Sequence, residues 1–159
     1  MQSIRVHGQG SNKYDNVRIG INGRLDTIQA AVLLEKLAIF PEEIEERNRA
    51  AKAYNGKLHG LVKVPHVPSG STSVWAQYSV LFERREVLQE NLKKAGIPTA
   101  VYYPKPLHLQ EAFSSLGYRE GDFPVSEEIS RKVFSLPMHP YLSDETIEQI
   151  ASVIKECSK

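Results

Sequence analysis

Cysteines and long hydrophobic runs are both scarce in this sequence. Cys157 is the single cysteine among 159 residues, so the chain has neither a disulfide framework nor a cysteine set for zinc. No apolar run approaches the ~20 residues that a membrane-spanning helix needs, and residues 1–8 lack the apolar segment of a signal peptide. These absences favour a cytoplasmic protein with no membrane partner, and we expect the thiol of Cys157 to be inert.

An excess of charge of either sign is also missing. The 20 Lys and Arg residues are balanced by 19 Asp and Glu residues, which gives a formal net charge of +1 at pH 7. Such a chain has no long-range field to steer nucleic acid, so we expect no nucleic-acid partner. A hydrophobic content of 41% and a charged content of 25% are typical of a globular chain with its own core.

Several catalytic motifs are absent as well. The five histidines show no HxxxH or HExxH spacing and no accompanying carboxylate cluster, so no metal site is predicted. The sequence contains no GxSxG elbow, no Walker loop and no dinucleotide-binding glycine fingerprint. Hydrolase, nucleoside triphosphatase and dinucleotide-dependent functions therefore have no motif to support them.

Hydrophobic patterning predicts short strands alternating with helices. Strands are expected at residues 4–6, 62–64, within 74–82, at 99–101 and at 133–136. Helices are expected at residues 28–37, 41–58, 84–95, 125–132 and from 143 onward. This order indicates an α/β chain in which a small sheet is covered by helices.

Signals for helix ends are strong at several positions. Asp26 is expected to cap a helix, with Gln29 in the capping-box position. Pro41 is expected to begin a separate helix as its first residue. Gly96 is placed to end a helix in a Schellman motif, and Ser143 is placed to cap the last helix.

The first candidate binding segment is residues 20–26, where a glycine-rich loop meets a predicted helix start. Backbone N–H groups, the amide of Asn22 and the guanidinium of Arg24 converge there, and together they suit a phosphate or a carboxylate. The alternative is structural, with Asn22 making a turn and Arg24 a surface ion pair.

The second candidate segment is residues 102–110, a loop stiffened by two prolines. It presents two phenols and an imidazole, from Tyr102, Tyr103 and His108, and such polar groups suit a polar small molecule. The alternative is a packed loop, with a tyrosine half in the core and His108 satisfied by backbone. His139, between two prolines, is more typical of a structural residue.

Four segments together resemble one enzyme family. HGQG at residues 7–10 followed by GINGRLDTIQAAVLLEKL at residues 20–37 resembles the central signature of the DegT-type sugar aminotransferases, which depend on vitamin B6. Residues 96–99 (GIPT), 102–110 (YYPKPLHLQ) and 134–140 (FSLPMHP) resemble the same family in order and spacing. The resemblance implies an α/β chain that is the C-terminal portion of an aspartate-aminotransferase-like (fold type I) enzyme, a small sheet covered by helices plus long linking helices. Residues 1–58 would end the large cofactor domain and supply linking helices, and residues 59–159 would form the small α/β domain.

The resemblance also implies an activity. Enzymes of this family convert a keto group on a nucleotide-sugar into an amine, using pyridoxal 5'-phosphate and usually glutamate as the amino donor. Their site is shared across a homodimer interface. The similarity of residues 7–16 to enzymes of bacterial surface-polysaccharide pathways, such as those for lipopolysaccharide O-antigen, implies a UDP-linked 3-keto sugar, with a uronic acid as one form.

Individual site residues follow from the same resemblance. Asn22 would bind the cofactor phosphate of the neighbouring subunit, and Arg24 beside it would face an anionic part of the substrate. Tyr102, Tyr103 and His108 would contact the nucleotide-sugar. Family members often carry histidine at the position of Tyr102, so this chain departs from the family pattern there.

No catalytic residue is predicted in this chain. In the family, the lysine that forms the Schiff base precedes the HGQG-like segment, whereas Lys13 follows it. Because transamination needs an amine held at the cofactor's aldehyde, the chain by itself is expected to be inactive. The alternative hypothesis is a natural non-catalytic module that dimerises or binds a nucleotide-sugar.

Overall fold

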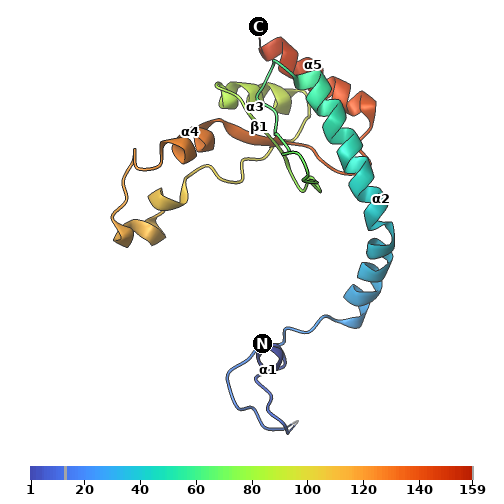
Figure 1. Ribbon diagram of the computed structural model, residues 1–159, viewed down its shortest axis with the longest axis vertical. Coiled ribbons are helices and arrows are strands. Elements are labelled where there is room, and N and C mark those ends of the chain that lie inside the picture. Colours follow the sequence, from blue (N-terminus) through green and yellow to red (C-terminus); the bar gives the residue numbers. More distant parts are fainter. Residues whose placement is uncertain (13, 159) are drawn as a thin grey trace. The chain divides into compact units, whose positions relative to one another are not determined.

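The computed structural model describes residues 1–12 and 14–158 (Figure 1), so Lys13 lies outside the described residues. The chain divides into two compact units, Met1–Pro41 and Glu42–Lys159. Within the described part, no helix combines the length and the apolar character that crossing a bilayer requires.

The first unit begins with a helical turn where the sequence predicted a strand. Helix α1 spans Gln2–Arg5, and of residues 4–6 Val6 alone pairs in a strand-like way, through an isolated antiparallel bridge to Asn22. The prediction of a strand at residues 4–6 was wrong. Because a single bridge offers no ladder to extend, the preceding residues complete their hydrogen bonds locally, with the Arg5 N–H donating to the Met1 carbonyl at 3.2 Å.

Close backbone packing holds the glycine-rich loop in this unit. The Ile21 N–H donates to the Ile4 carbonyl at 2.8 Å, and the His7 N–H donates to the Ile21 carbonyl at 3.0 Å. A Cβ atom on Gly20 would lie 2.1 Å from the backbone nitrogen of Gly8, which no real side chain permits. Glycine at position 20 is therefore required by the approach of the two backbone segments.

Helix α2 runs without a break over Thr27–Leu58, with Pro41 inside it. Asp26 caps the helix as predicted, since its Oδ1 accepts the Gln29 N–H at 2.9 Å. The expected new helix start at Pro41 was wrong. A proline removes one donor and crowds one carbonyl, but its fixed φ is helical, so helix-forming residues on both sides carry the helix through.

The second unit contains a two-stranded antiparallel sheet. Strand β1, Tyr78–Leu81, pairs with β2, Val133–Leu136, so that Tyr78 lies opposite Leu136. The strands predicted at residues 62–64 and 99–101 are reduced to single bridges, Lys63 to Leu81 and Ala100 to Ser135. Each of those segments adjoins a proline, at 65 and 98, which cannot donate to a ladder.

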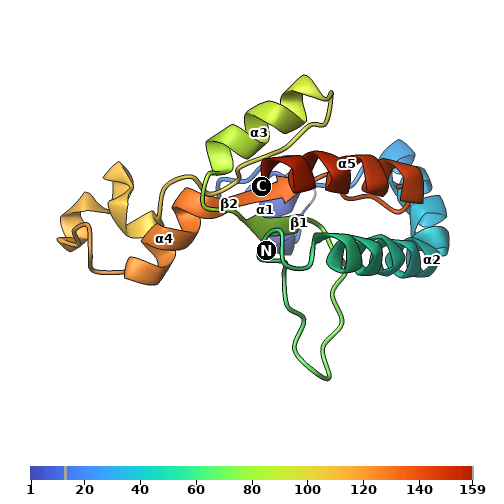
Figure 2. The ribbon, with the colours of Figure 1, turned by 90° about the horizontal axis from the view of Figure 1, so that it is seen from above.

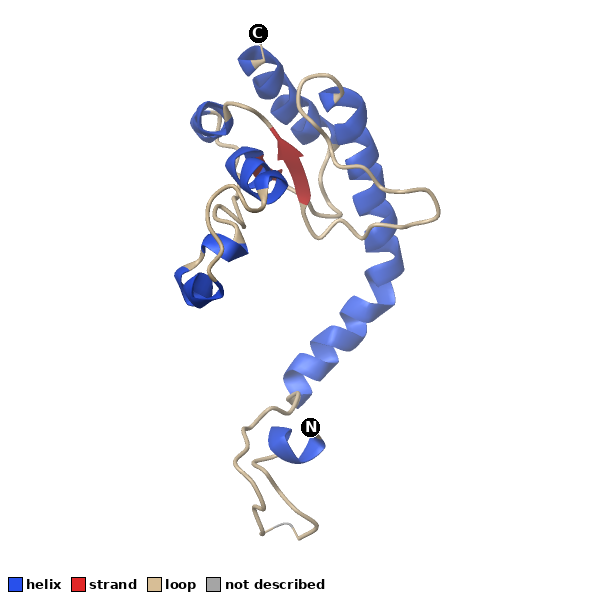
Figure 3. Cartoon of the chain, turned by 60° about the vertical axis from the view of Figure 1, so that its left-hand side comes forward, coloured by secondary structure: helices blue, strands red, loops and turns tan. Residues whose placement is uncertain are grey.

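Three further helices belong to this unit: α3 at Arg85–Lys94, α4 at Pro124–Lys132 and α5 at Asp144–Cys157. Two short 3-10 turns, Leu107–Leu109 and Glu111–Leu116, lie in the long connection before α4. Helices α2 and α5 lie side by side (Figure 2), joined by an ion pair of 2.7 Å between Arg49 and Asp144 and by one between Lys57 and Glu148. Helices and loops therefore dominate the chain, as Figure 3 shows.

The predicted ends of α3 and α5 are confirmed. Gly96 adopts a φ of 75° and donates its N–H to the Lys93 carbonyl at 3.0 Å, while the next N–H reaches the Leu92 carbonyl at 2.9 Å. This is the Schellman pattern. The Ser143 side chain accepts the Thr146 N–H at 3.2 Å and so caps α5.

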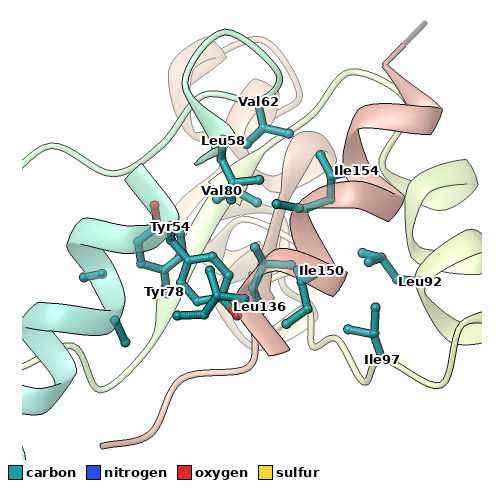
Figure 4. Close-up of a cluster of buried hydrophobic side chains, with 14 of the residues drawn as sticks. Tyr54, Leu58, Val62, Tyr78, Val80, Leu92, Ile97, Leu136, Ile150 and Ile154 are labelled. Carbon is teal, nitrogen blue, oxygen red and sulfur yellow. The ribbon is translucent and has the colours of Figure 1, made fainter. Parts of the chain in front are cut away.

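The core of the second unit lies where α2, α3 and α5 meet the sheet (Figure 4). The rings of Tyr54 and Tyr78 stack with their centroids 4.7 Å apart, and the Tyr54 hydroxyl donates to the Pro137 carbonyl at 3.0 Å. Burial raises the pKa of both phenols. The largest fully buried side chains are Tyr54, Tyr78, Phe134, Leu58, Leu88, Leu92, Ile147, Ile150, Ile154 and Val80.

Candidate functional site

A hollow of about 370 Å³ lies at the start of α2, in the first unit. Its lining brings together the two residues predicted for an anion, Asn22 and Arg24, with Leu25, Asp26 and Thr27. The backbone around Asn22 is held by its bridge to Val6. Among residues 1–12 and 14–158, no side-chain hydrogen bond or ion pair engages Asn22 or Arg24, so both polar groups are available to a ligand.

The hydrogen-bond donors of this hollow are mainly side-chain groups, because the first backbone N–H groups of α2 contribute little. The Gln29 N–H of the first turn of α2 is already bonded to the Asp26 carboxylate. The binding of an anion would therefore depend on the amide of Asn22 and the guanidinium of Arg24. The amide can donate a hydrogen bond to a phosphate or carboxylate oxygen, and the guanidinium can donate two parallel ones.

The predicted tyrosines belong to the second unit and are open to solvent. Tyr102 is 54% exposed and Tyr103 is 73% exposed. Tyr102 also lines a hollow of about 220 Å³ whose polar walls include Gln77, Thr99 and Ser135. The possibility that a tyrosine of this loop lies half in the core does not hold for Tyr103, which is the more exposed of the two.

A network that the sequence did not reveal supports one wall of that hollow. Trp75 adopts a φ of 49°, which is unusual for a bulky residue. Its indole N–H donates to Asn48 Oδ1 at 2.9 Å, and its carbonyl accepts the Arg47 guanidinium at 3.0 Å. The Asn48 amide also donates to the Ser73 carbonyl at 3.2 Å. Helix α2 thus fixes a strained backbone two residues before Gln77.

His108 is placed differently from the exposed tyrosines. Its Nε2 lies 2.9 Å from Oε1 of Glu127, and the side chains of the two residues are 7% and 6% exposed. The ring also contacts that of Phe123, with centroids 4.8 Å apart. The hydrogen-bond partner of the His108 ring is therefore the Glu127 carboxylate. The sequence had left open a backbone partner instead.

Glu127, like the network around Trp75, was not identified from the sequence. It follows Ser126 and precedes Glu128 in an ordinary charged stretch, which gives no signal of burial. Burial alone would raise the pKa of its carboxyl, but hydrogen bonds from the Gly121 N–H, His108 and the Phe123 N–H outweigh that effect and hold the pKa below its usual range. The carboxylate is therefore ionised near neutral pH.

The described residues show no metal centre. No group of three or more His, Cys, Asp or Glu side chains within residues 1–12 and 14–158 is placed to hold a metal ion.

The sequence is similar to those of known sugar aminotransferases. A curated relative from Pseudomonas aeruginosa, UDP-2-acetamido-2-deoxy-3-oxo-D-glucuronate aminotransferase, is 42% identical over 155 residues, which cover 97% of this chain and 42% of the relative. The chain therefore spans well under half the length of this relative.

Solved structures similar to this chain are also aminotransferases. An aminotransferase from Brucella abortus superposes with a TM-score of 0.89 at 52% identity, over 98% of this chain and 42% of that one. DesV from S. venezuelae gives a TM-score of 0.89 at 32% identity, over 99% of this chain and 43% of that one. These neighbours confirm the expected α/β fold of the aminotransferase type.

The family comparison covers nearly the whole sequence. The model of the DegT/DnrJ/EryC1/StrS aminotransferases matches residues 1–155, a range that includes all four segments of the resemblance. The chain belongs to the DegT/DnrJ/EryC1/StrS aminotransferase family.

Proposed function

We propose that the protein containing this chain is an aminotransferase that depends on pyridoxal 5'-phosphate and converts the keto group of a nucleotide-sugar into an amine. The observation that supports the proposal is the hollow at the start of α2, which is lined by Asn22 and Arg24, two residues without side-chain partners in the described part of the chain. An amide and a guanidinium at one hollow are suited to the anionic groups of both the cofactor and a nucleotide-sugar.

The residues of this hollow fit the phosphate of the cofactor. We assign the Asn22 amide to a phosphate oxygen of the cofactor bound to the neighbouring subunit of a homodimer. When bound, pyridoxal phosphate supplies an electron sink and carries the amino group between donor and acceptor. The chain's contribution is to hold the phosphate and to orient the substrate, and none of its lysines is assigned a catalytic role.

The proposed substrate is a UDP-linked 3-keto sugar, with glutamate as the amino donor. The relative from Pseudomonas aeruginosa is named for a UDP-linked 3-oxo-glucuronate, a sugar with a carboxylate. Arg24 is suited to that carboxylate because a guanidinium pairs with it through two parallel hydrogen bonds. We assign the product to the synthesis of a surface polysaccharide such as the O-antigen of a lipopolysaccharide.

Tyr102, Tyr103 and His108 are proposed as substrate contacts. The two phenols are exposed on a loop that carries Pro104 and Pro106, so little backbone entropy is lost when a ligand binds. In the domain organisation that we propose, residues 1–58 complete a cofactor domain with its linking helices, and residues 59–159 form a small α/β domain.

The first test is a covalent adduct. The 159-residue chain is mixed with pyridoxal phosphate, reduced with borohydride and analysed by intact mass and peptide mapping. We expect no stoichiometric adduct at a single lysine. One specific adduct, with an absorbance band bleached by an amino donor, would show that a lysine of this chain is catalytic and that the assignment above is wrong.

The second test is enzymatic and uses the complete enzyme that contains these residues. Asn22→Ala should weaken pyridoxal phosphate binding by about 1–3 kcal/mol, because one hydrogen bond to a charged group is lost. Asn16→Ala, which removes the same amide from the first unit at a position that does not line the hollow, is the matched control. Equal cofactor affinity in Asn22→Ala and Asn16→Ala would remove Asn22 from the site.

A further inference from the structure

The carboxylate of Glu127 accepts hydrogen bonds from three residues in two segments of the second unit, the loop that contains Gly121 and Phe123 and the segment that contains His108. The Gly121 N–H lies 2.9 Å and 3.0 Å from its two oxygens, the Phe123 N–H lies 3.3 Å from Oε1, and His108 Nε2 lies 2.9 Å from Oε1. A capping contact at the start of α4 would account for Phe123 alone. The contacts to Gly121 and His108 show that this side chain does more than cap a helix.

The state of the carboxylate determines the state of the imidazole. An ionised carboxylate can only accept hydrogen bonds, so the contact of 2.9 Å requires a hydrogen on Nε2 of His108. In the neutral ring the other nitrogen, Nδ1, then carries the lone pair. Glu127 therefore selects which nitrogen of His108 can accept a hydrogen bond.

The second ring nitrogen is open. No protein group in the described part of the chain bonds Nδ1 of His108, and the one buried side-chain polar atom without a partner there is Ser3 Oγ. Nδ1 is thus not completely shielded from solvent, although the side chain is only 7% exposed. His108 belongs to the same segment, residues 102–110, as the exposed phenols of Tyr102 and Tyr103.

We propose that Glu127 is a positioning residue that holds the imidazole of His108 with Nδ1 presented as a hydrogen-bond acceptor for a hydroxyl or amino group of a polar ligand. This inference rests on the proposed function, because the hydroxyl groups of a nucleotide-sugar are donors of this kind. Glu127 acts only through His108 and through the backbone of residues 121–123. The arrangement is that of a carboxylate that orients a histidine by bonding its far nitrogen.

The first experiment needs no ligand and no activity. In the proton NMR spectrum of the chain labelled with ¹⁵N-histidine, the Nε2–H of His108 should give a downfield, slowly exchanging signal. Glu127→Ala should abolish this signal, and Glu127→Gln, which keeps an acceptor oxygen, should restore it. Glu128→Ala removes the neighbouring carboxylate, which is bonded to Lys132, and should leave the signal unchanged.

The second experiment separates positioning from folding in the complete enzyme. His108→Gln keeps a donor that can reach Glu127 but removes Nδ1, so KM for the keto nucleotide-sugar should rise roughly 3- to 10-fold, the loss expected for one hydrogen bond, with kcat unchanged. Glu127→Ala should raise KM by a similar factor. In the double variant the two effects should not multiply, since both substitutions remove the same contact.

Each outcome bears on the inference. Absence of a protected Nε2–H in the wild-type protein, or its persistence in Glu127→Ala, would overturn the positioning role even if Glu127→Ala were too unstable for kinetics. Multiplying KM effects in the double variant would also overturn it. Because the NMR arm is independent of turnover, a failed amination assay would contradict the proposed function and leave the Glu127–His108 result standing.

Discussion

At the scale of single residues, Asn48 has a structural role outside the predicted site. Its amide accepts the Trp75 indole N–H at 2.9 Å and donates to the carbonyls of Ile44 and Ser73. These bonds hold Trp75 at a φ of 49°, which bulky residues adopt only when their surroundings impose it. A side chain on α2 thereby sets the path of the chain into β1.

We predict that Asn48→Ala lowers the free energy of unfolding by about 1–3 kcal/mol, because it leaves half-buried donors and acceptors unpaired. Trp75 is the sole tryptophan, so urea unfolding followed by its fluorescence reports both stability and the local change. Asn91→Ala is the control, since the Asn91 amide donates to the Val87 carbonyl one turn earlier on the surface of α3. Equal midpoints for the two variants would show that Asn48 does not stabilise the bend at Trp75.

The lowered pKa of Glu127 leads us to predict that the free energy of unfolding depends on pH. Its folded pKa is depressed below the ordinary value of 4.5, so its contribution is present above that value and is lost as the pH falls through the folded pKa. Glu127→Gln should therefore flatten the fall in unfolding free energy below about pH 4.5 relative to wild type, as measured by urea titrations at a series of pH values.

The control for this pH dependence is Glu120→Gln. It removes the same charge from an exposed side chain in the neighbouring loop and should leave the slope close to that of wild type. If both variants followed the wild-type curve, the depressed pKa of Glu127 would not be linked to folding.

At the scale of elements, the end of α3 was predictable because its signal is local. Gly96 supplies a positive φ that other residues adopt at a penalty, and the hydrogen bonds of the motif involve only neighbours in sequence. The continuity of α2 through Pro41 was not predictable in this way. A proline is compatible with both a helix start and a helix interior, and the choice depends on the residues and packing around it.

Two glycine substitutions test whether local backbone conformation explains the role of Gly96, because they should change the free energy of unfolding in opposite directions. Gly96→Ala should destabilise the chain by about 1–2 kcal/mol, because alanine is strained at a φ of 75° although no atom lies within 4 Å of the new Cβ. Gly56→Ala, inside α2 and equally unobstructed, should stabilise it by about 0.5–1 kcal/mol. Urea unfolding followed by circular dichroism measures both, and shifts of the same sign would contradict the explanation.

At the scale of the whole molecule, the first part of α2 exposes an unusual amount of apolar surface. Ile28 is 80% exposed, and Leu34 and Leu37 are each 67% exposed. Residues 28–37 are apolar apart from Gln29, Glu35 and Lys36, and a helix without a clear polar face needs cover on more than one side. Exposed apolar patches of this kind favour association in water.

We predict that the 159-residue chain self-associates through this part of α2. Sedimentation velocity should show a mass that rises with protein concentration, and Leu34→Lys should shift the equilibrium toward monomer. Val87→Lys, at a position in α3 that is 50% exposed, is the control and should leave association unchanged. A chain that stays monomeric at all concentrations would contradict this account of α2.

The sequence by itself determined the features whose causes are local. Asp26, Gly96 and Ser143 end or begin helices through bonds to residues at most five positions away, and the segments of the family resemblance can be identified directly in the printed sequence. Asn22 and Arg24 lie in one short loop, which is why the sequence names them together as candidates, and the structure has both of them lining one hollow.

Only the tertiary structure decided the features that depend on distant partners. The strand lengths depend on which backbone groups meet a partner, and so residues 62–64 and 99–101 make single bridges. The conformation of Trp75 depends on Asn48, 27 positions earlier, and the state of His108 depends on Glu127, 19 positions later. Such pairs carry no signal in one sequence, because an asparagine or a glutamate in a polar stretch is indistinguishable from its solvated neighbours until the fold brings its partner within hydrogen-bonding distance.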